Sequence, residues 1–337
     1  MKIDTKIRKA LLAVVERFPR QRIVMLGDLV ADEFIFGEIA RVSREAPVLI
    51  LKQREKRIVP GGGANAANNL ADLGAQVTPV GIVGEDEAGE ALLHYFEQKG
   101  VSTRLISRSP STLTPTKSRI LGGITHWQSQ QIVRVDREPS ARPGADARRR
   151  LSRAVAPLLR EAAALLVSDY GYGTTDSREV DFLRRHAGSK RLPVTVDSRF
   201  DLISFQRITA ATPNEPEVEE AFGVRVENRM EVLHQLGKKA LARQKLEALL
   251  VTRGRDGMVL FERQRPPQHL PIFGSDQAVD VTGAGDTVIA AFTLAVAAGS
   301  SFLHAAMLAN IAGGLVVMKR GTATVTGEEI KEAIRNA

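Results

Sequence analysis

Residues 280–287 have the sequence DVTGAGDT and are followed by an apolar run of helical character over 288–298. Small residues just before a helix let backbone N–H groups approach an anion closely, and the helix dipole favours negative charge there. The segment therefore predicts a phosphate-binding loop. Its Asp286 can accept the proton of an attacking hydroxyl, which makes it the candidate catalytic base. The alternative is a glycine-rich loop in which Asp286 only caps the helix.

A second glycine-rich segment, PGGGANAAN at residues 60–68, leads into a helix expected over 64–73. Its three glycines permit the close approach of a polyol, and Asn65 can both donate to and accept from hydroxyl groups. A tight turn into a helix is the alternative interpretation. Taken with residues 280–287, this segment predicts one site for a polyol and another for phosphate.

Two carboxylates, Asp28 and Asp32, follow a short apolar run at 23–26 that predicts a buried strand. At the carboxyl end of such a strand they can bind sugar hydroxyls, although on their own they would serve as turn and cap residues. The two glycine-rich segments and these carboxylates together account for both reactants of a phosphoryl transfer to a polyol.

After residue 143, helical patterns alternate with short apolar strands expected at 163–168, 192–197, 208–211, 249–252 and 258–261. Such alternation predicts an α/β fold, with a doubly wound, mainly parallel sheet and helices on both of its faces. Polar residues follow most of these strands. Ligands of open parallel sheets bind at the carboxyl ends of the strands, so these residues mark the expected site.

Residues 1–20 predict an amphipathic N-terminal helix, and residues 21–337 a single continuous domain. Two segments, at about 38–59 and 115–137, are rich in β-forming residues mixed with charges, and they predict a small, half-exposed antiparallel lid. Exposed strands at the edges of a lid favour pairing between subunits, so we expect a homodimer.

Composition excludes several classes of protein. The 337-residue chain has no cysteine, which rules out disulfides and thiol nucleophiles, and its longest apolar run, at 288–299, is too short to cross a membrane. We expect a cytoplasmic protein without a membrane partner. The net charge of +8 is concentrated between residues 134 and 160, where no nucleic-acid motif occurs, so we expect no nucleic-acid partner.

The motifs GGGAN at 61–65, NEPE at 214–217 and DVTGAGDT at 280–287 resemble those of the ribokinase, or phosphofructokinase-B-type, carbohydrate kinase family. The resemblance extends over about residues 20–335. Further segments resemble the D-glycero-β-D-manno-heptose 7-phosphate kinase branch of that family, and they lie at 27–32, 41–48, 116–119, 131–136, 308–310 and 321–326.

The resemblance implies a ribokinase-like fold, ATP as co-substrate, Mg²⁺ and, in some relatives, K⁺. It also implies that Asp286 is the base. The residues implied for the remaining roles are Gly283, Ala284 and Gly285 for an anion hole of backbone amides, Asp28, Asp32, Gly62, Gly63 and Asn65 for the sugar, Asn214, Thr252, Gly254 and Asn310 for the nucleotide, Asn214 and Glu217 for Mg²⁺ through water, and Asp280 and Thr282 for the monovalent cation.

Five polar residues in or beside the expected lid can hold a phosphate group of the substrate, because guanidinium and ammonium groups bind phosphate well. They are Arg41, Ser43, Lys117, Arg119 and Arg134. Ordinary charges on the lid surface are the alternative. The chain departs from the branch at Tyr172, where the branch commonly has lysine, and at Arg199, which keeps a positive charge.

The resemblance thus implies transfer of a phosphoryl group to the anomeric hydroxyl of D-glycero-β-D-manno-heptose 7-phosphate. The product would be the 1,7-bisphosphate used for ADP-heptose, a precursor of the lipopolysaccharide core. The alternatives are a kinase for another sugar or sugar phosphate, favoured by Tyr172, and a non-catalytic sugar-phosphate sensor. We recognise no nucleotidyltransferase segment in this sequence, so we expect a later adenylylation to require another protein.

Overall fold

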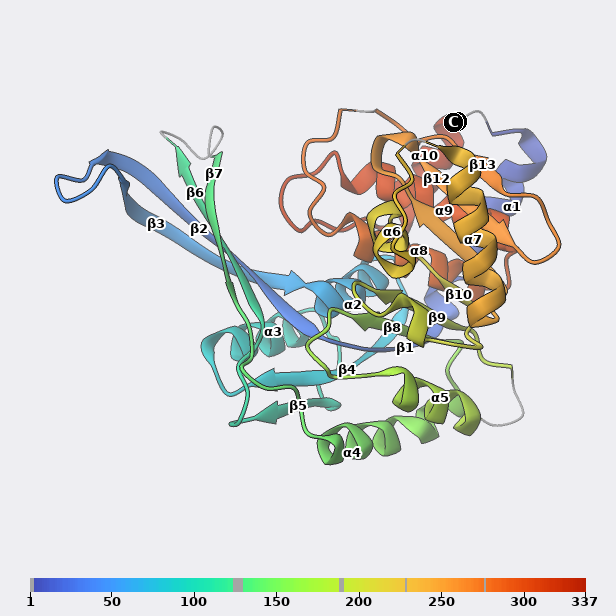
Figure 1. Ribbon diagram of the computed structural model, residues 1–337, viewed down its shortest axis with the longest axis horizontal. Helices are drawn as coiled ribbons and strands as arrows, with labels where there is room; N and C mark the ends of the chain where they lie inside the picture. The colour runs from blue at the N-terminus through green and yellow to red at the C-terminus, as the bar shows by residue number, and fades with distance from the viewer. Residues whose placement is uncertain (1–2, 124–129, 188–190, 228, 276) are drawn as a thin grey trace.

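The molecule consists of a compact α/β body and a long, slender arm of strands that projects from it (Figure 1). The computed structural model describes residues 3–123, 130–187, 191–227, 229–275 and 277–337. In these ranges the strands form a nine-stranded sheet, which lies in the body, and a four-stranded sheet, which forms the arm.

The nine-stranded sheet of the described residues has the order β13-β12-β11-β10-β9-β8-β1-β4-β5. All neighbours from β11 to β5 are parallel, whereas β12 is antiparallel to both of its neighbours. Its strands are β1 (Arg22–Gly27), β4 (Gln76–Gly84), β5 (Ile106–Ser109), β8 (Ala164–Asp169), β9 (Val194–Ser198), β10 (Ala210–Ala211), β11 (Ala248–Thr252), β12 (Met258–Glu262) and β13 (Gln268–Leu270).

Helices cover both faces of this sheet. One face packs against α1 (Thr5–Val15), α2 (Gly62–Asp72), α3 (Glu87–Gln98), α8 (Ala284–Ala297), α9 (Phe302–Val316) and α10 (Gly327–Asn336). The other face packs against α4 (Ala145–Val155), α5 (Ser177–His186), α6 (Glu215–Phe222) and α7 (Met230–Gln244). The expected doubly wound, mainly parallel α/β fold is therefore confirmed.

The central strands show why both faces are covered. Along β1, the side chains of Ile23 and Met25 enter one core, and those of Val24 and Leu26 enter the other. Successive side chains of a strand point to opposite faces, so a continuous run of apolar residues must be buried on both sides. This pattern identified β1, β8 and β11 from the sequence.

The arm contains β2 (Leu29–Val42), β3 (Leu49–Gly61), β6 (Thr116–Gly123) and β7 (Gln130–Arg137), in the order β3-β2-β6-β7. Strand β2 begins two residues after β1 ends, so the chain passes directly from the body into the arm. The arm was expected to be antiparallel, and this was wrong for one pair: β2 and β6 are parallel, because the 73 residues between them form β3 and then pass through the body. Residues 124–129 of the expected lid lie outside the described residues.

The boundaries of other elements also differ from those expected. Strand β4 pairs with β1 in the centre of the sheet. Its sequence, QVTPVGIVG, contains one proline, one glutamine and two glycines, which interrupt the apolar pattern, so the sequence did not indicate this strand. Helix α8 begins at Ala284, four residues before its apolar run, and therefore includes Asp286 in its first turn. Within the described ranges, no helix is both long and apolar enough to span a membrane.

Candidate active site

Asp286 lies in the first turn of α8, and its side chain is buried, with 2% of the residue exposed. The turn before the helix requires glycine, because Gly283 has a φ of 75°, and a Cβ there would lie 2.5 Å from Nδ2 of Asn65. Gly285 differs, since a Cβ at this position would meet no atom of the described residues within 4 Å. The backbone at Gly285 therefore faces open space at the N-terminus of the helix.

Two of the three amides proposed for an anion hole are available at this helix start. Ala284 donates its N–H to the carbonyl of Val281 at 3.2 Å, whereas the described residues supply no acceptor for the N–H groups of Gly283 and Gly285. The free N–H groups of a helix N-terminus attract anions. Gly283 and Gly285 are therefore the better anion-binding positions of the three.

A chain of buried amide groups joins Asp286 to α2. Nδ2 of Asn65 donates to Oδ2 of Asp286 at 2.9 Å, and Oδ1 of Asn65 accepts from Asn69 at 3.1 Å. Oδ1 of Asn69 in turn accepts from the hydroxyl of Thr287 at 2.8 Å, which returns the network to α8. These bonds fix the rotamer of Asp286, because each donor is itself held in place.

Tyr170 provides the second contact of Asp286, and it was not among the residues expected from the sequence. Its hydroxyl donates to Oδ1 of Asp286 at 2.9 Å. The ring of Tyr170 lies under the ammonium group of Lys117, with Nζ 5.1 Å from the ring centroid. Nothing in the sequence around residue 170 indicated that β8 would place a phenol beside α8.

Burial raises the pKa of Asp286 to about 7, because a charged carboxylate is poorly solvated there. The hydrogen bonds from Asn65 and Tyr170 oppose this effect, the negative charge of Asp32 adds to it, and the positive charge of Lys117 opposes it. A carboxyl group with a pKa near neutrality suits a general base, which must gain and lose a proton at working pH.

Asp32 lies near the body end of β2, where it joins the arm to the loop before α10. Its Oδ1 accepts from Arg119 of β6 at 2.8 Å, and its Oδ2 accepts from the hydroxyl of Thr322 at 2.8 Å. Only 4% of the residue is exposed. A cavity of about 710 Å³ opens beside this junction, with Arg119, Thr282 and Thr322 in its lining.

Asp28 was expected to bind sugar hydroxyls, but the structure gives its carboxylate other partners. Its two oxygens accept the backbone N–H groups of Tyr170, Tyr172 and Thr174 at 2.9, 3.0 and 2.9 Å. With 1% of the residue exposed, the carboxylate is enclosed by the loop that it holds. Asp28 therefore positions the loop 170–174, including Tyr170, and its place in a sugar site is not supported.

Gly62 and Gly63 allow α2 to begin against the ends of β1 and β2. A Cβ at Gly63 would lie 2.7 Å from the carbonyl oxygen of Asp28, and one at Gly62, whose φ is 52°, would lie 2.7 Å from a methyl group of Val30. Both glycines thus permit the close packing that brings Asn65 to Asp286.

The five polar residues expected to hold a substrate phosphate are not gathered in one place. Lys117 lies beside Tyr170, but Arg119 is paired with Asp32. Arg134 forms two hydrogen bonds to Asp136 on the exposed strand β7.

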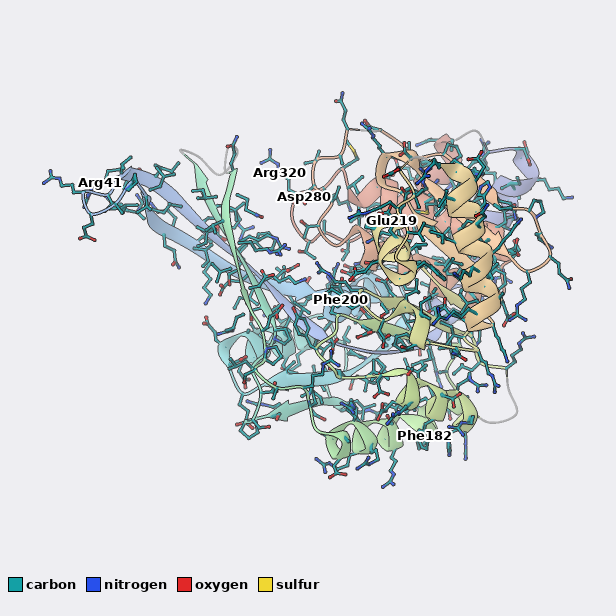
Figure 2. All side chains as sticks on the ribbon, viewed as in Figure 1. Arg41, Phe182, Phe200, Glu219, Asp280 and Arg320 are labelled. Carbon is teal, nitrogen blue, oxygen red and sulfur yellow. The ribbon has the colours of Figure 1, made fainter. Side chains whose placement is uncertain are left out.

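Arg41 and Ser43 lie at the far end of the arm, as Figure 2 shows for Arg41. Arg41 lies nine positions after Asp32 along β2, which corresponds to roughly 30 Å of extended strand. In this chain, Arg41 and Ser43 are therefore not brought to Asp286.

Asn214 and Glu217 form a capping box at the start of α6. The Asn214 side chain accepts from the N–H of Glu217 at 2.8 Å, and the Glu217 carboxylate accepts from the N–H of Asn214 at 2.9 Å. Burial raises the pKa of Glu217 to about 6. Burial also raises the pKa of Asp197, at the end of β9, and the charges of Glu217 and Asp286 raise it further.

The carboxylates of Asp197 and Glu217 are the candidates for holding the expected Mg²⁺. In the part of the chain that the structure describes, no three acidic, histidine or cysteine residues are grouped closely enough to hold a metal directly. Carboxylates that repel one another across a gap nevertheless suit a cation between them, and Mg²⁺ keeps several of its waters in such sites. Asp197, which the sequence reasoning missed, joins Asn214 and Glu217 as a residue that fits such an ion.

The remaining nucleotide candidates lie at neighbouring strand and helix ends. Thr252, at the end of β11, forms a β-bridge with Asn214, and Gly254 follows two residues later with a φ of 55°. The side-chain amide of Asn310, on α9, donates to the carbonyl of Pro271 at 2.8 Å. Asn310 therefore supports the loop after β13.

Asp280 ties two loops together at the expected cation position. Its carboxylate accepts from the N–H of Thr282 at 2.9 Å and from the N–H of Gly321 at 2.9 Å. These bonds order the loop that leads into α8. The oxygens retain further lone pairs, so the geometry is compatible with a monovalent cation without indicating one.

The arrangement as a whole is that of a small-molecule kinase: a doubly wound sheet, a buried carboxylate at a glycine-rich helix start, and polar residues along one sheet edge. Residues 21–329 match the model of the pfkB family carbohydrate kinases. The chain belongs to this family, whose members transfer a phosphoryl group to an alcohol group of their acceptor.

Among curated relatives, the bifunctional protein HldE of Pelobacter propionicus is 36% identical over 328 residues, which are 97% of this chain and 66% of that protein. HldE of Hahella chejuensis is 38% identical over 94% of this chain and 64% of its own length. The chain thus spans slightly less than two thirds of these relatives.

Solved structures confirm the ribokinase-like fold. Arabidopsis thaliana ribokinase complexed with ribose and ATP superposes with a TM-score of 0.73 and 22% identity, covering 94% of this chain and 98% of that one. Escherichia coli phosphofructokinase-2 in complex with potassium gives a TM-score of 0.74 and 17% identity, with the same two coverages.

Proposed function

We propose that this chain is an ATP-dependent kinase that phosphorylates the anomeric hydroxyl of D-glycero-β-D-manno-heptose 7-phosphate, for the synthesis of ADP-heptose. The observation that carries the proposal is the position of Asp286: a buried carboxylate in the first turn of α8, beside the N–H groups of Gly283 and Gly285, which have no acceptor among the described residues. Such a site can bind a phosphoryl group and deprotonate an acceptor at the same point.

In the proposed reaction, an oxygen lone pair of the acceptor hydroxyl attacks the γ-phosphorus of ATP. A new O–P bond forms, the bond from the γ-phosphorus to the bridging oxygen breaks, and ADP leaves with that electron pair. Asp286 takes the proton of the hydroxyl. The N–H groups of Gly283 and Gly285 stabilise the charge that develops on the transferred group.

The neighbouring side chains orient the base. Asn65 and Tyr170 each hold one carboxylate oxygen of Asp286 at 2.9 Å, so the acceptor hydroxyl must approach a remaining lone pair. Mg²⁺ would neutralise the phosphates of ATP, held through water by Asn214, Glu217 and Asp197. Thr252, Gly254 and Asn310 would border the nucleotide, and Asp280 with Thr282 a K⁺ ion.

Two lines support a heptose phosphate as acceptor. The motifs of the heptose 7-phosphate kinase branch occur along the sequence, and the HldE relatives are 36–38% identical over nearly the whole chain. A kinase for another sugar phosphate is the second candidate, favoured by Tyr172, whose hydroxyl donates to Glu138 at 3.1 Å where a lysine would have supplied a charge.

The test is ATP consumption by the purified protein with Mg²⁺ and K⁺. Heptose 7-phosphate is offered beside free heptose, fructose 6-phosphate and ribose, with Asp286→Asn as the control for contaminating kinases. Preference for heptose 7-phosphate would support the proposal. Turnover on only one of the other acceptors would assign a different substrate to the enzyme. The absence of turnover on all four would refute the proposed kinase activity.

We also propose that the arm forms a homodimer interface. Support comes from large apolar side chains that the arm exposes on both faces, namely Ile39, Val42, Val48, Leu49, Ile132, Val133 and Val135. Exposed apolar strands usually have a partner. Sedimentation would detect a dimer of the wild type that Val133→Lys weakens, and a monomeric wild type at micromolar concentration would overturn the proposal.

A further inference from the structure

A second cavity, of about 380 Å³, lies against Tyr170 and is distinct from the one beside Asp32. Its lining includes Lys117 of the arm, Tyr170 and Tyr172 of the loop after β8, and Arg199 and Phe200 of the loop after β9. We refer to it as the Lys117–Arg199 cavity. Figure 2 labels Phe200, which lies between the base of the arm and the body.

Lys117 is the most unusual residue of this cavity. Only 9% of it is exposed, and among the described residues its ammonium group has neither an ion pair nor a hydrogen bond, only the ring of Tyr170. A buried ammonium group without a counter-charge is costly. Burial lowers the pKa of Lys117, the positive charge of Arg199 lowers it further, and the negative charges of Asp32 and Asp136 oppose these effects only in part.

Arg199 adds a second positive charge to the same cavity. Its guanidinium group lies over the ring of Phe200, 5.4 Å from the centroid, and no carboxylate within the described ranges forms an ion pair with it. Of the carboxylates that line the cavity, Asp136 forms an ion pair with Arg134, and Glu138 keeps its negative charge while it accepts a hydrogen bond from Tyr172. Two cations that have no ion-pair partner among the described residues therefore line one cavity.

We propose that the Lys117–Arg199 cavity binds the phosphate group that the acceptor sugar already carries, with Arg199 as a residue that determines specificity for phosphorylated sugars. This inference rests on the proposed kinase function. An ammonium and a guanidinium group together supply the charge and the hydrogen-bond donors that a phosphate dianion requires.

Tyr170 sets the geometry of the acceptor, because it borders both sites. Its hydroxyl contacts Asp286, where the reacting hydroxyl must lie, while its ring packs under Lys117. The distance between the reacting hydroxyl and the phosphate of the acceptor must therefore be at least the length of the Tyr170 side chain. A sugar phosphorylated at the end opposite the reacting hydroxyl meets this requirement, whereas a free sugar leaves both cations unpaired.

The other arm cations do not fit this role. Arg119 and Arg134 are neutralised by Asp32 and Asp136, and Arg41 lies at the far end of the arm. Lys117 alone of the five residues expected to contact phosphate is both buried and unpaired in the described structure.

The first experiment measures binding without ATP, so that it does not depend on turnover. Titration calorimetry compares heptose 7-phosphate with free heptose for the wild type, Lys117→Met, Arg199→Met and the control Lys52→Met, which removes a charge from the exposed part of β3. We expect each cavity variant to weaken binding of the phosphate form by roughly 10- to 100-fold. The affinity of the cavity variants for free heptose should equal that of the wild type. Lys52→Met should bind both forms of heptose as the wild type does.

Thermal unfolding confirms that each variant is folded, and Lys117→Arg should restore part of the affinity because it restores the charge. The inference is overturned if the wild type binds both forms of heptose equally, or if the variants weaken both forms equally. Discrimination by the cavity without ATP turnover would refute the kinase but keep the phosphate site. Turnover with no preference for phosphorylated acceptors would keep the kinase activity but refute the phosphate site.

Discussion

The hydroxyl of Tyr170 and the carboxylate of Asp286 are joined by a 2.9 Å hydrogen bond, although 116 residues separate them in the sequence. The loop that carries Tyr170 is itself held by Asp28, whose carboxylate accepts three of its backbone N–H groups. A residue at the end of β1 therefore controls the environment of a side chain at the start of α8. The following predictions test the parts of this arrangement.

Asp286→Asn preserves the size of the side chain but removes the proton acceptor. General-base catalysis contributes about 10²- to 10⁴-fold to a rate, so we expect kcat to fall by at least that range. Binding of ATP, measured by calorimetry, should change little, because the N–H groups of Gly283 and Gly285 remain. Turnover close to that of the wild type would show that Asp286 is not the base.

The pH dependence of kcat/KM should report the ionisation of Asp286. Because burial raises its pKa to about 7, the carboxyl group is protonated and inactive below that pH and ionised above it. We expect kcat/KM to rise about tenfold per pH unit below pH 7 and to level off above it. Initial rates between pH 5 and 9 at saturating ATP would check this, and a profile already flat from pH 5 would contradict it.

Tyr170→Phe removes one of the hydrogen bonds that lower the pKa of Asp286. The pKa of the base should therefore rise, and the acidic limb of the pH profile should move to higher pH by about one unit. Tyr95→Phe, on α3 and distant from the site in sequence and fold, serves as the control. An unchanged limb, or one moved to lower pH, would mean that Tyr170 does not act on the base.

Asp28→Asn distinguishes a positioning role from a sugar-binding role. The amide cannot accept all three backbone N–H groups, so we expect a loss of about 2–4 kcal/mol in the free energy of unfolding, together with a lower kcat. Urea denaturation and steady-state kinetics measure the two effects. A variant of normal stability with only a raised KM for the sugar would instead restore the original sugar-binding interpretation.

Gly285→Ala separates folding from ligand approach. The added Cβ meets no atom within 4 Å in the part of the chain that the structure describes, and alanine favours the helix by about 1 kcal/mol, so the variant should be at least as stable as the wild type. The methyl group would nevertheless occupy the space in which the transferred phosphoryl group must lie, so turnover should fall by tenfold or more. A stable variant with unimpaired turnover would remove Gly285 from the anion site.

Local sequence patterns were sufficient for much of the fold. Continuous apolar runs identified β1, β8 and β11, because strands buried on both faces need apolar side chains throughout. Strand β4 escaped notice because Pro79 and Gly81 break the same pattern. Gly81 pairs with β5, and the side chain of Leu29 approaches it closely. The parallel pairing of β2 with β6 was also missed, because strand direction depends on the path of the intervening chain.

The sequence by itself determined the family, the glycine-rich loop and the identity of Asp286 as the candidate base, since each depends on residue types at short spacings. Only the tertiary structure decided that Asp28 holds a loop and that Tyr170 and Asn65 contact Asp286. It also decided that Lys117 is buried in one cavity with Arg199, with no ion-pair partner among the described residues. These relationships join residues from different strands and helices. Local sequence cannot specify them, because packing of the whole chain sets which side chains meet and which charges are left unpaired.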